Sequence, residues 1–403
     1  MGEHTRRILS AIACLIMGCA VGVVVTYCAT TGALNQHAIS TEAVQRGTEK
    51  YLEIMNLVDN YFIGEDVDMT AVNDAMASGI ISGLGDQWSY YVSAEDYQAY
   101  VENINNAYVG VGITITAKND ADGNLLGYEV TEVTAGGPAE EAGVLAGDVL
   151  IQVGDTSVKD ITLTEVKNMV KGEEGSTVEL TFQRDEENLT VTLERRAMNI
   201  IPAEGQLLDD GIGYITIDNF DAGCAETVKG LIEDLQAQGA TSLLFDVRNN
   251  PGGLKTELTD ILDYLLPEGI VFHTVNYAGE EEIITSDADC VDLPMAVLVN
   301  ESSYSAAEYF ACAIQEYGVG KVVGEKTYGK GYYQVGLTLS DGSCINLSIG
   351  KYYTPSGESL IDVGVTPDVE LSLNEEEAIA LAQSQLSPEE DPQVQAAIAC
   401  LEP

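Results

Sequence analysis

The sequence predicts a multidomain α+β protein with a membrane segment, a helical region, a small β-rich module, an α/β core and an acidic tail. The 403 residues amount to roughly two to three typical domains. β-Branched residues and turn signals crowd residues 101–196, and from Gly211 onward strand patterns alternate with helical ones. With 45% apolar and 21% charged residues, the composition is that of a globular protein and excludes a disordered or fibrous chain.

Residues 1–37 are predicted to form a short cytoplasmic segment and a transmembrane anchor. From Ile8 to Leu34 about 27 residues are uncharged, where roughly 20 span a bilayer. Arg6 and Arg7 precede this stretch and no Lys or Arg follows until Arg46, which places the rest of the chain outside the cytoplasm. Two alternatives stay open: a signal peptide cleaved near residues 28–30 and a lipoprotein signal around residues 18–19.

Residues 38–100 predict a helical region. Apolar residues recur at helical spacing from Thr41 to about Phe62, and again from Val72 to Leu84. In the module at 101–196 the sequence predicts short strands near residues 112–116, 128–131, 149–153 and 177–182.

Residues 197–370 predict a sheet whose strands are joined by crossover helices. Strands expected at 213–217, 242–247 and 295–299 each precede a helix, at 225–235, 254–266 and 306–317. In the tail, 371–403, we expect the acidic runs Glu375–Glu377 and Glu389–Asp391 to form a solvated face around a docked helix.

Composition also limits partners and cofactors. The net charge of −47 repels phosphates, so no nucleic-acid partner is expected. Only His4, His37 and His273 are present, which excludes a multi-histidine metal site and leaves His273 as the one histidine for a triad. The five cysteines beyond the membrane segment form no metal-binding or redox motif, so buried free thiols are expected.

A serine lies where a strand turns into a helix. Ser305 follows the apolar run 295–299 and opens the helical pattern, so its hydroxyl stands beside free backbone N–H groups at a helix N-terminus. That position suits a nucleophile whose substrate develops an oxyanion. Ser305 with Glu308 also fits an ordinary capping box, which any helix can carry.

A serine nucleophile needs a base, and Lys330 lies between Gly329 and Gly331. An exposed lysine is almost wholly protonated at pH 7, and lowering its pKa to about 7 takes on the order of 4 to 5 kcal/mol, which burial can supply. The alternative is a solvated Gly-Lys-Gly turn.

The third motif is the strand-to-loop stretch 245–253, which ends in Gly252 and Gly253. These glycines let the backbone approach a ligand closely, and their amides suit an oxyanion hole. Asp246 and Arg248 are expected to pair and fix the loop. The plain alternative is a turn after a strand.

Together these motifs resemble the carboxyl-terminal processing, or tail-specific, proteases. The resemblance rests on Asp-Val-Arg-Asn-Asn-Pro-Gly-Gly (246–253), Val-Asn-x-x-Ser-x-Ser-Ala-x-Glu (299–308) and Val-Gly-Glu-Lys-Thr-Tyr-Gly-Lys-Gly (323–331), in family order. Flanking stretches agree: 84–89 resembles the family's helical-region signature, 108–112 and 137–143 its PDZ module, and 353–357 and 364–368 its closing segment. The match covers roughly residues 45 to 370.

The resemblance implies a crotonase-like core preceded by an inserted PDZ domain. It makes Ser305 the nucleophile, Lys330 the general base and Gln334 the residue that orients the lysine. The amides of Ala306 and of Gly252 or Gly253 would be the oxyanion donors. Residues four apart on a straight strand lie about 13 Å apart, so Lys330 and Gln334 meet only through long side chains or a bend.

The sequence departs from the family pattern at a few positions. Tyr304, Ala307, Tyr332 and Tyr333 replace residues that are usually smaller or different, and Gln87-Trp88 replaces the usual Pro-Tyr. These departures bear on substrate preference more than on the reaction.

The PDZ resemblance predicts a groove for a peptide C-terminus. Gly110, Val111 and Gly112 would turn successive amides toward a carboxylate, and the strand from Ile113 would offer its edge to an extended peptide. The second wall would be helix 163–170, with Val166 and either Met169 or Val170 lining an apolar pocket.

The sequence therefore predicts a bacterial, single-pass membrane protein with an extracytoplasmic serine endopeptidase that cleaves substrates bearing free C-termini. No metal or organic cofactor is implied. The alternatives are a catalytically inactive PDZ scaffold and a crotonase-like enzyme acting on acyl-CoA. The physiological substrate and the oligomeric state, a homo-oligomer included, stay open.

Overall fold

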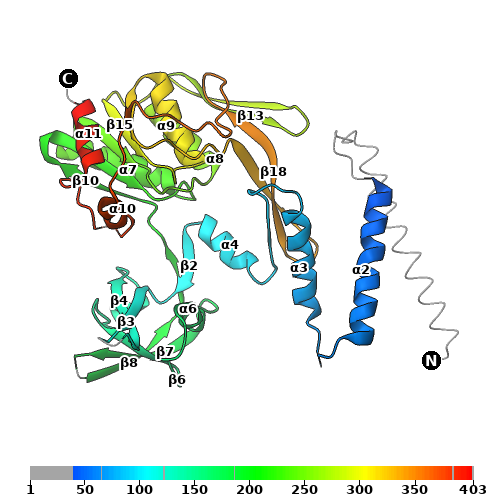
Figure 1. The fold of residues 1–403 in the computed structure, drawn as a ribbon. Coiled ribbons are helices and arrows are strands. Elements are labelled where there is room, and N and C mark those ends of the chain that lie inside the picture. Colours follow the sequence, from blue (N-terminus) through cyan, green and yellow to red (C-terminus); the bar gives the residue numbers. More distant parts are fainter. Residues whose placement is uncertain (1–39, 65, 121–122, 186, 384, 402–403) are drawn as a thin grey trace.

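The computed structural model describes residues 40–64, 66–120, 123–185, 187–383 and 385–401 (Figure 1). The predicted membrane segment and its two alternatives fall outside these residues. Within the described part of the chain, no helix combines the length and apolar character needed to cross a membrane.

The N-terminal region holds helices α2 (Thr41–Tyr61), α3 (Met69–Ser82) and α4 (Tyr97–Ile104), with strand β1 (Tyr90–Val92) between the last two. The two predicted helices are confirmed. Each begins at a polar cap, because Ser40 and Asp68 accept hydrogen bonds from amides of the first turn. Strand β1 pairs with a strand of the core, so this region contributes directly to the core's sheet.

A two-stranded ribbon carries the β-rich module. The chain enters through β2 (Ala107–Gly110) and leaves through β9 (Arg196–Asn199), which pair antiparallel. The module's sheet has the order β3-β4-β5-β7-β8, so β3 lies at its edge. Its elements are β3 (Ile113–Asn119), β4 (Leu125–Val133), α5 (Pro138–Glu141), β5 (Val149–Val153), β6 (Thr156–Ser157), α6 (Leu163–Val170), β7 (Thr177–Arg184) and β8 (Glu187–Glu194). All four predicted strands are present.

The α/β core is built on a six-stranded sheet of order β10-β11-β12-β15-β16-β19, parallel except for β10. Three strands lead into helices as predicted. The elements are β10 (Ala203–Leu208), the short helix η1 (Asp209–Gly211), β11 (Ile212–Ile217), α7 (Cys224–Gln238), β12 (Ser242–Asp246), α8 (Lys255–Leu265), β15 (Met295–Val299), α9 (Ala306–Tyr317), β16 (Gly320–Gly324) and β19 (Val369–Glu370).

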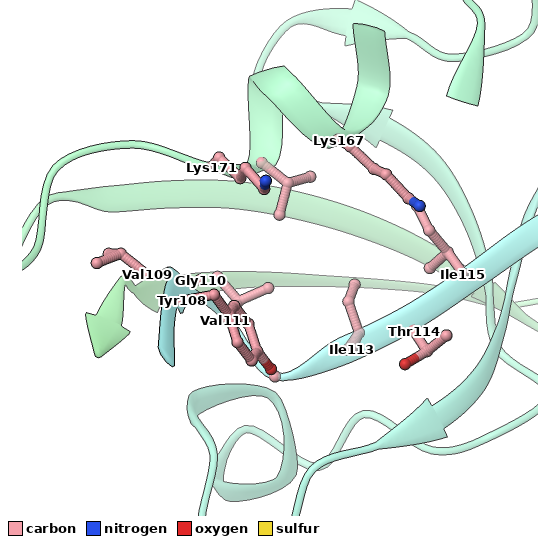
Figure 2. Close-up of a pocket in the computed structure, with 11 residues that line it drawn as sticks. Tyr108, Val109, Gly110, Val111, Ile113, Thr114, Ile115, Lys167 and Lys171 are labelled. Atoms are coloured by element: carbon pink, nitrogen blue, oxygen red, sulfur yellow. The ribbon is translucent and has the colours of Figure 1, made fainter. Parts of the chain in front are cut away.

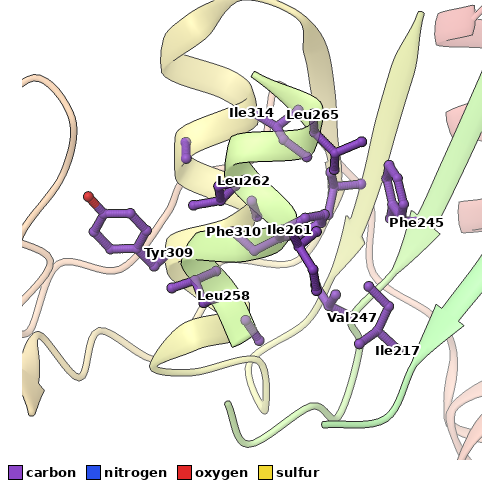
Figure 3. Close-up of a cluster of buried hydrophobic side chains, with 14 of the residues drawn as sticks. Ile217, Phe245, Val247, Leu258, Ile261, Leu262, Leu265, Tyr309, Phe310 and Ile314 are labelled. Atoms are coloured by element: carbon purple, nitrogen blue, oxygen red, sulfur yellow. The ribbon is translucent and has the colours of Figure 1, made fainter. Parts of the chain in front are cut away.

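Helices cover both faces of this sheet. On one face, side chains of β11, β12 and β15 pack against α7, α8 and α9, with Phe245 and Phe310 in edge contact (Figure 3). On the other face, Tyr214, Leu244 and Leu298 pack against helix α11 (Pro392–Leu401). Successive side chains of each strand point to opposite faces, and both faces are covered. The core strands therefore appear in the sequence as continuous apolar runs.

A second, antiparallel sheet of order β1-β18-β13-β14, with β17 also paired to β18, lies beside the first. Its strands β13 (Gly269–Asn276), β14 (Glu281–Ser286), β17 (Tyr332–Thr338) and β18 (Cys344–Tyr353) were not predicted from the sequence. Many of their residues are half-buried or exposed, so the runs lack the apolar character of the parallel strands.

The tail forms α10 (Glu375–Ala382) and α11 (Pro392–Leu401), and α11 is the docked helix that the sequence predicted. One expectation was wrong: Asp391 is not solvated but buried, because it accepts a hydrogen bond from the Arg248 guanidinium at 2.7 Å. Arg248 also pairs with Asp246 as expected. The ion pairs therefore tie the loop after β12 to the start of α11.

The cysteines of the described residues are free thiols. Cys224, Cys312 and Cys344 are buried, whereas Cys290 and Cys400 are half-buried.

Candidate active site

Three loops at one edge of the parallel sheet bring the sequence motifs together. They follow β12, β15 and β16, and the carboxyl ends of parallel strands meet at the same edge. Hydrogen bonds join the loops: Ser303 donates to the Val247 carbonyl at 2.7 Å, and the Tyr328 amide donates to the Ser303 carbonyl at 3.2 Å. The loops that carry Gly252, Ser305 and Lys330 thus form one structural unit.

Ser305 occupies a strained turn at the N-terminus of α9. Its φ of 59° and ψ of −121° lie outside the ordinary regions for a residue with a side chain. Gly252 packs directly against it, since a Cβ at position 252 would lie 2.7 Å from the Ser305 Cβ. Glycine is therefore required there, and the surrounding loops hold the serine in place.

Glu308 is a buried carboxylate that connects the serine turn with the lysine loop. It accepts hydrogen bonds from the amides of Ser305 (2.9 Å), Gly329 (3.1 Å) and Lys330 (3.0 Å). Burial raises its pKa, and these amide donors act in the opposite direction. The capping-box interpretation is correct for the Glu308 side chain, which in addition fixes the backbone of the predicted base.

Lys330 lies in a largely apolar environment. Burial lowers its pKa to about 8, against the opposing pull of the nearby carboxylates of Glu308 and Asp86. The neutral amine is therefore far more accessible near neutral pH than it is for a lysine with the ordinary pKa of 10.5. The burial that the sequence argument required is present.

An aromatic cluster that the sequence argument missed covers this lysine. The Lys330 Nζ lies 4.6 Å from the Trp88 ring centroid and 6.0 Å from that of Tyr304. Trp88 in turn contacts Tyr304 and Tyr328, at centroid distances of 5.6 and 5.3 Å. The signal was available, because Trp88 lies in the stretch 84–89 that carries a family signature.

The N-terminal stretch is held against the core by hydrogen bonds. The Ser89 hydroxyl donates to Asp86 and accepts from the Ser348 amide at 2.9 Å. The Tyr328 hydroxyl donates to Gln87 at 3.3 Å. A segment more than 200 residues away in sequence thus forms part of the lysine's surroundings.

The predicted oxyanion donors differ in availability. The Gly252 amide donates to Asn250 Oδ1 at 2.8 Å and is occupied. Among the described residues, the amides of Gly253 and Ala306 have no acceptor, and both residues line the same cleft as Ser305. Of the two glycines left open by the sequence, Gly253 fits the role of donor, whereas Gly252 allows the close approach to Ser305.

Gln334 lines the cleft, but its side-chain amide donates to Ser348 Oγ at 3.0 Å and to the Tyr332 carbonyl at 3.4 Å. The bend that its role requires is present, since Gly329 and Gly331 both have positive φ and the β17–β18 register shifts between Tyr333 and Gln334. No hydrogen bond joins Gln334 to Lys330 within the described chain. Its orienting role stays a prediction.

Ser305, Ala306, Lys330 and Gln334 share one cleft of about 690 Å³, whose walls include α4 and the start of α8. Tyr352, which also lines the cleft, accepts a hydrogen bond from the Gly331 amide at 3.0 Å. The lining contains no histidine. His273 lies on β13, 4.0 Å from Glu281.

A second site lies in the β-rich module, between the free edge of β3 and helix α6 (Figure 2). Gly110, Val111, Gly112 and Ile113 line it together with Val170, and their role in peptide binding stays a prediction. The expectation for Val166 was wrong, because Val166 is not among the residues that line the groove and its side chain is fully buried in the module's core. Met169 also packs on that core, and the groove is lined instead by Lys167 of the helix and by Lys171, the residue that caps its C-terminus.

Comparison with known proteins agrees with this architecture. Residues 211–371 match the family model of peptidase family S41, and residues 129–184 match that of the PDZ domain. The "Probable CtpA-like serine protease" of Staphylococcus aureus (strain bovine RF122 / ET3-1) is 30% identical over 372 residues, which are 91% of this chain and 73% of that protein. The "Carboxyl-terminal-processing peptidase 2, chloroplastic" of Arabidopsis thaliana is 31% identical over 300 residues, 72% of this chain.

The fold and the matches define a serine peptidase architecture with a PDZ domain. The chain belongs to peptidase family S41, among relatives named as carboxyl-terminal processing peptidases. It spans 58% of the length of the Arabidopsis relative. A solved structure named "Putative S41 protease" from Bacteroides fragilis shares the fold, with a TM-score of 0.53, 18% identity, and 83% of this chain and 91% of that one covered.

Proposed function

We propose that the protein is a serine endopeptidase that cleaves through a Ser305–Lys330 dyad. The observation that carries the proposal is the cleft itself, in which a strained serine at a helix N-terminus and a half-buried lysine with a pKa of about 8 line the same surface. The absence of histidine from that lining supports lysine as the base.

The reaction follows from these groups. Neutral Lys330 takes the proton of the Ser305 hydroxyl as Oγ attacks the scissile carbonyl carbon. The resulting oxyanion accepts hydrogen bonds from the amides of Ala306 and Gly253. The Lys330 ammonium then gives its proton to the departing amine, leaving an acyl-enzyme, and water hydrolyses this ester with Lys330 again as base.

Geometry adds one requirement. In this structure Nζ lies over the Trp88 ring and, among the described residues, no hydrogen bond joins it to Ser305, whereas proton transfer needs it within about 3 Å of the Ser305 oxygen. Rotation of the four-carbon lysine side chain makes that move, and Gln334 would then orient the amine.

We further propose that the PDZ groove selects substrates by their free C-terminus. The edge strand β3 offers unpaired backbone groups for an extended peptide, and Gly112, with φ of 78°, turns the chain at the start of that strand. Amidated peptides of the same sequence should therefore be cleaved more slowly. Equal rates for both forms would contradict carboxylate recognition.

The fold of the catalytic part is proposed to be crotonase-like. The parallel sheet, the helices on its face and the oxyanion amides after β12 and at the start of α9 support this interpretation.

Membrane anchoring through residues 8–34, with the catalytic part outside the cytoplasm of a bacterium, is proposed from the sequence. Added protease should then digest the region after Thr41 in intact protoplasts. A soluble mature form that begins near Ala29 would instead establish cleavage of a signal peptide.

A homo-oligomer is proposed from α2, which buries no residue and exposes Leu52, Leu57 and Tyr61. Chemical crosslinking of the purified full chain tests it. Recovery of the monomer alone after crosslinking would contradict it.

A fluorogenic peptide assay tests the catalytic proposal directly. Wild-type protein should hydrolyse the peptide and Ser305→Ala should not. Absence of turnover in both would favour the alternative, an inactive PDZ scaffold. Retention of turnover in Ser305→Ala would remove the serine from the mechanism.

A further inference from the structure

The PDZ groove is positively charged, whereas the protein as a whole is strongly negative. The chain has 65 acidic and 18 basic residues, yet the groove is lined by Lys167 and Lys171 and by no carboxylate. Both lysines are exposed, and within the described residues neither forms an ion pair or a side-chain hydrogen bond. Two uncompensated ammonium groups therefore stand at a site open to solvent.

The lysines occupy opposite ends of the groove. Figure 2 shows Lys171 toward the Gly110–Val111 end and Lys167 reaching toward Ile115 on β3. Both positions follow from helix geometry, because Lys171 caps the C-terminus of α6 four residues after Lys167, and residues four apart lie on the same face of a helix. The face rotated away from them carries Val166 into the core.

Strand geometry relates these ends to positions on a bound peptide. A peptide added to β3 antiparallel places its terminal carboxylate at the Gly110–Gly112 turn and its last side chain near Ile113. Ile115 is two residues further along, about 7 Å away, so it faces the third residue from the peptide's end. Lys167 therefore meets that residue, and Lys171 lies close to the terminal carboxylate.

From this placement we propose that the groove selects C-termini with an acidic residue at the third position from the end, read by Lys167, while Lys171 supports the terminal carboxylate. The occupant is an extended polypeptide end with an apolar last residue and a carboxylate two residues before it. This assignment rests on the proposed function and adds the substrate class to it.

The test measures binding to the full chain carrying Ser305→Ala, which keeps the peptide intact. Three dye-labelled decapeptides differ only at the third residue from a free C-terminus, which is Glu, Gln or Lys, and each is also prepared as its amide. Fluorescence anisotropy then gives Kd. Exposed charge pairs of this kind change affinity by about two- to fivefold, so the Glu peptide should bind that much tighter than the Gln peptide and the Lys peptide weakest.

Variants assign the effect to individual lysines. Lys167→Gln should abolish the preference for Glu over Gln while the free acid still binds better than the amide. Lys171→Gln should reduce the free-acid preference. The control Lys159→Gln, an exposed lysine of the same module outside the groove, should change neither.

The outcomes separate this assignment from the proposed function. Equal affinity for the Glu, Gln and Lys peptides, with the free acids still preferred over the amides, would overturn the role of Lys167 alone. Equal affinity for acids and amides would overturn carboxylate recognition and this inference with it. Hydrolysis of a short peptide by the wild-type protein is measured separately. It tests the roles of Ser305 and Lys330, whatever the outcome of the binding experiment.

Discussion

The active-site cleft and the PDZ groove treat their charged groups in opposite ways. Around the cleft, Lys330, Glu308 and Arg248 are buried or nearly so, and hydrogen bonds, ion pairs or aromatic rings surround each one. In the groove, Lys167 and Lys171 are exposed and have no partner in the described chain. Buried charges acquire altered pKa values and large structural effects, whereas exposed charges favour one partner over another by small amounts.

The largest expected effect is at the dyad. Ser305→Ala and Lys330→Ala should each lower kcat/KM by about four to six orders of magnitude, because neither half of a nucleophile–base pair works without the other. The double variant should be hardly slower than either single one. Peptide binding in the groove, measured by anisotropy, should be unchanged in all three.

This prediction has a specific failure. If Lys330→Ala keeps substantial activity that disappears when His273 is also changed, histidine is the base. The shielded lysine of the cleft would then have no catalytic role to set against the exposed lysines of the groove.

Arg248 tests the cost of an unpaired buried charge. Arg248→Ala leaves the carboxylates of Asp246 and Asp391 buried without their partner and should lower the free energy of unfolding by about 3 to 5 kcal/mol, measured by urea denaturation. The matched control is Lys118→Ala in the PDZ module, where the pair with Glu129 is partly exposed and about 0 to 1 kcal/mol is expected. Similar losses in both variants would remove the distinction between buried and exposed pairs.

The third prediction concerns pH. In the proposed mechanism only deprotonated Lys330 acts as the base, so kcat/KM should rise with pH through about 8. Trp88→Ala admits water, which favours the ammonium and raises the lysine's pKa, so the rise should move to higher pH. Each unit of that shift costs about tenfold in activity at pH 7.

Trp88→Leu is the matched control for this effect, because it keeps an apolar cover and removes the ring that attracts the ammonium. Its pH profile should move slightly in the opposite direction. An unchanged profile in Trp88→Ala would show that the aromatic cover does not control the base.

The smallest effect is expected from salt. Raising the ionic strength from 50 to 500 mM screens exposed charges and should lower kcat/KM severalfold for a free-acid peptide with an acidic third-last residue. Cleavage of a short amidated peptide should be much less affected, because Lys330 and Glu308 lie largely shielded from solvent. Equal salt dependence for the two peptides would contradict the contrast between the exposed charges of the groove and the shielded charges of the cleft.

The parts of the fold that the sequence predicted are those with local signals. Strand β15, the turn at Ser305 and helix α9 follow from one apolar run and one capping pattern, and the pairing of Asp246 with Arg248 spans two residues. Long-range contacts had no such signal. The burial of Asp391 depends on Arg248, 143 positions earlier in the chain, and the acidic run around Asp391 favoured a solvated face.

The errors at α6 and near Lys330 have different physical origins. Val166 and Lys167 are neighbours in sequence but point about 100° apart on a helix, so a small misjudgement of the helix's rotation exchanges a core residue for a groove residue. Trp88 reaches Lys330 only because β1 pairs with β18 and brings the N-terminal stretch to the core. Periodicity within either segment contains no information about that pairing.

The contact between Trp88 and Lys330 also has a spectroscopic consequence. The chain contains one tryptophan, and its indole lies 4.6 Å from the nitrogen of the proposed catalytic base. Light absorbed at the red edge of the protein's spectrum therefore excites a single chromophore, whose emission depends on the charge and position of that amine. Titration of the lysine, its rotation toward the serine and the arrival of a peptide in the cleft should each change this emission, so the unlabelled protein contains its own optical reporter of the catalytic centre.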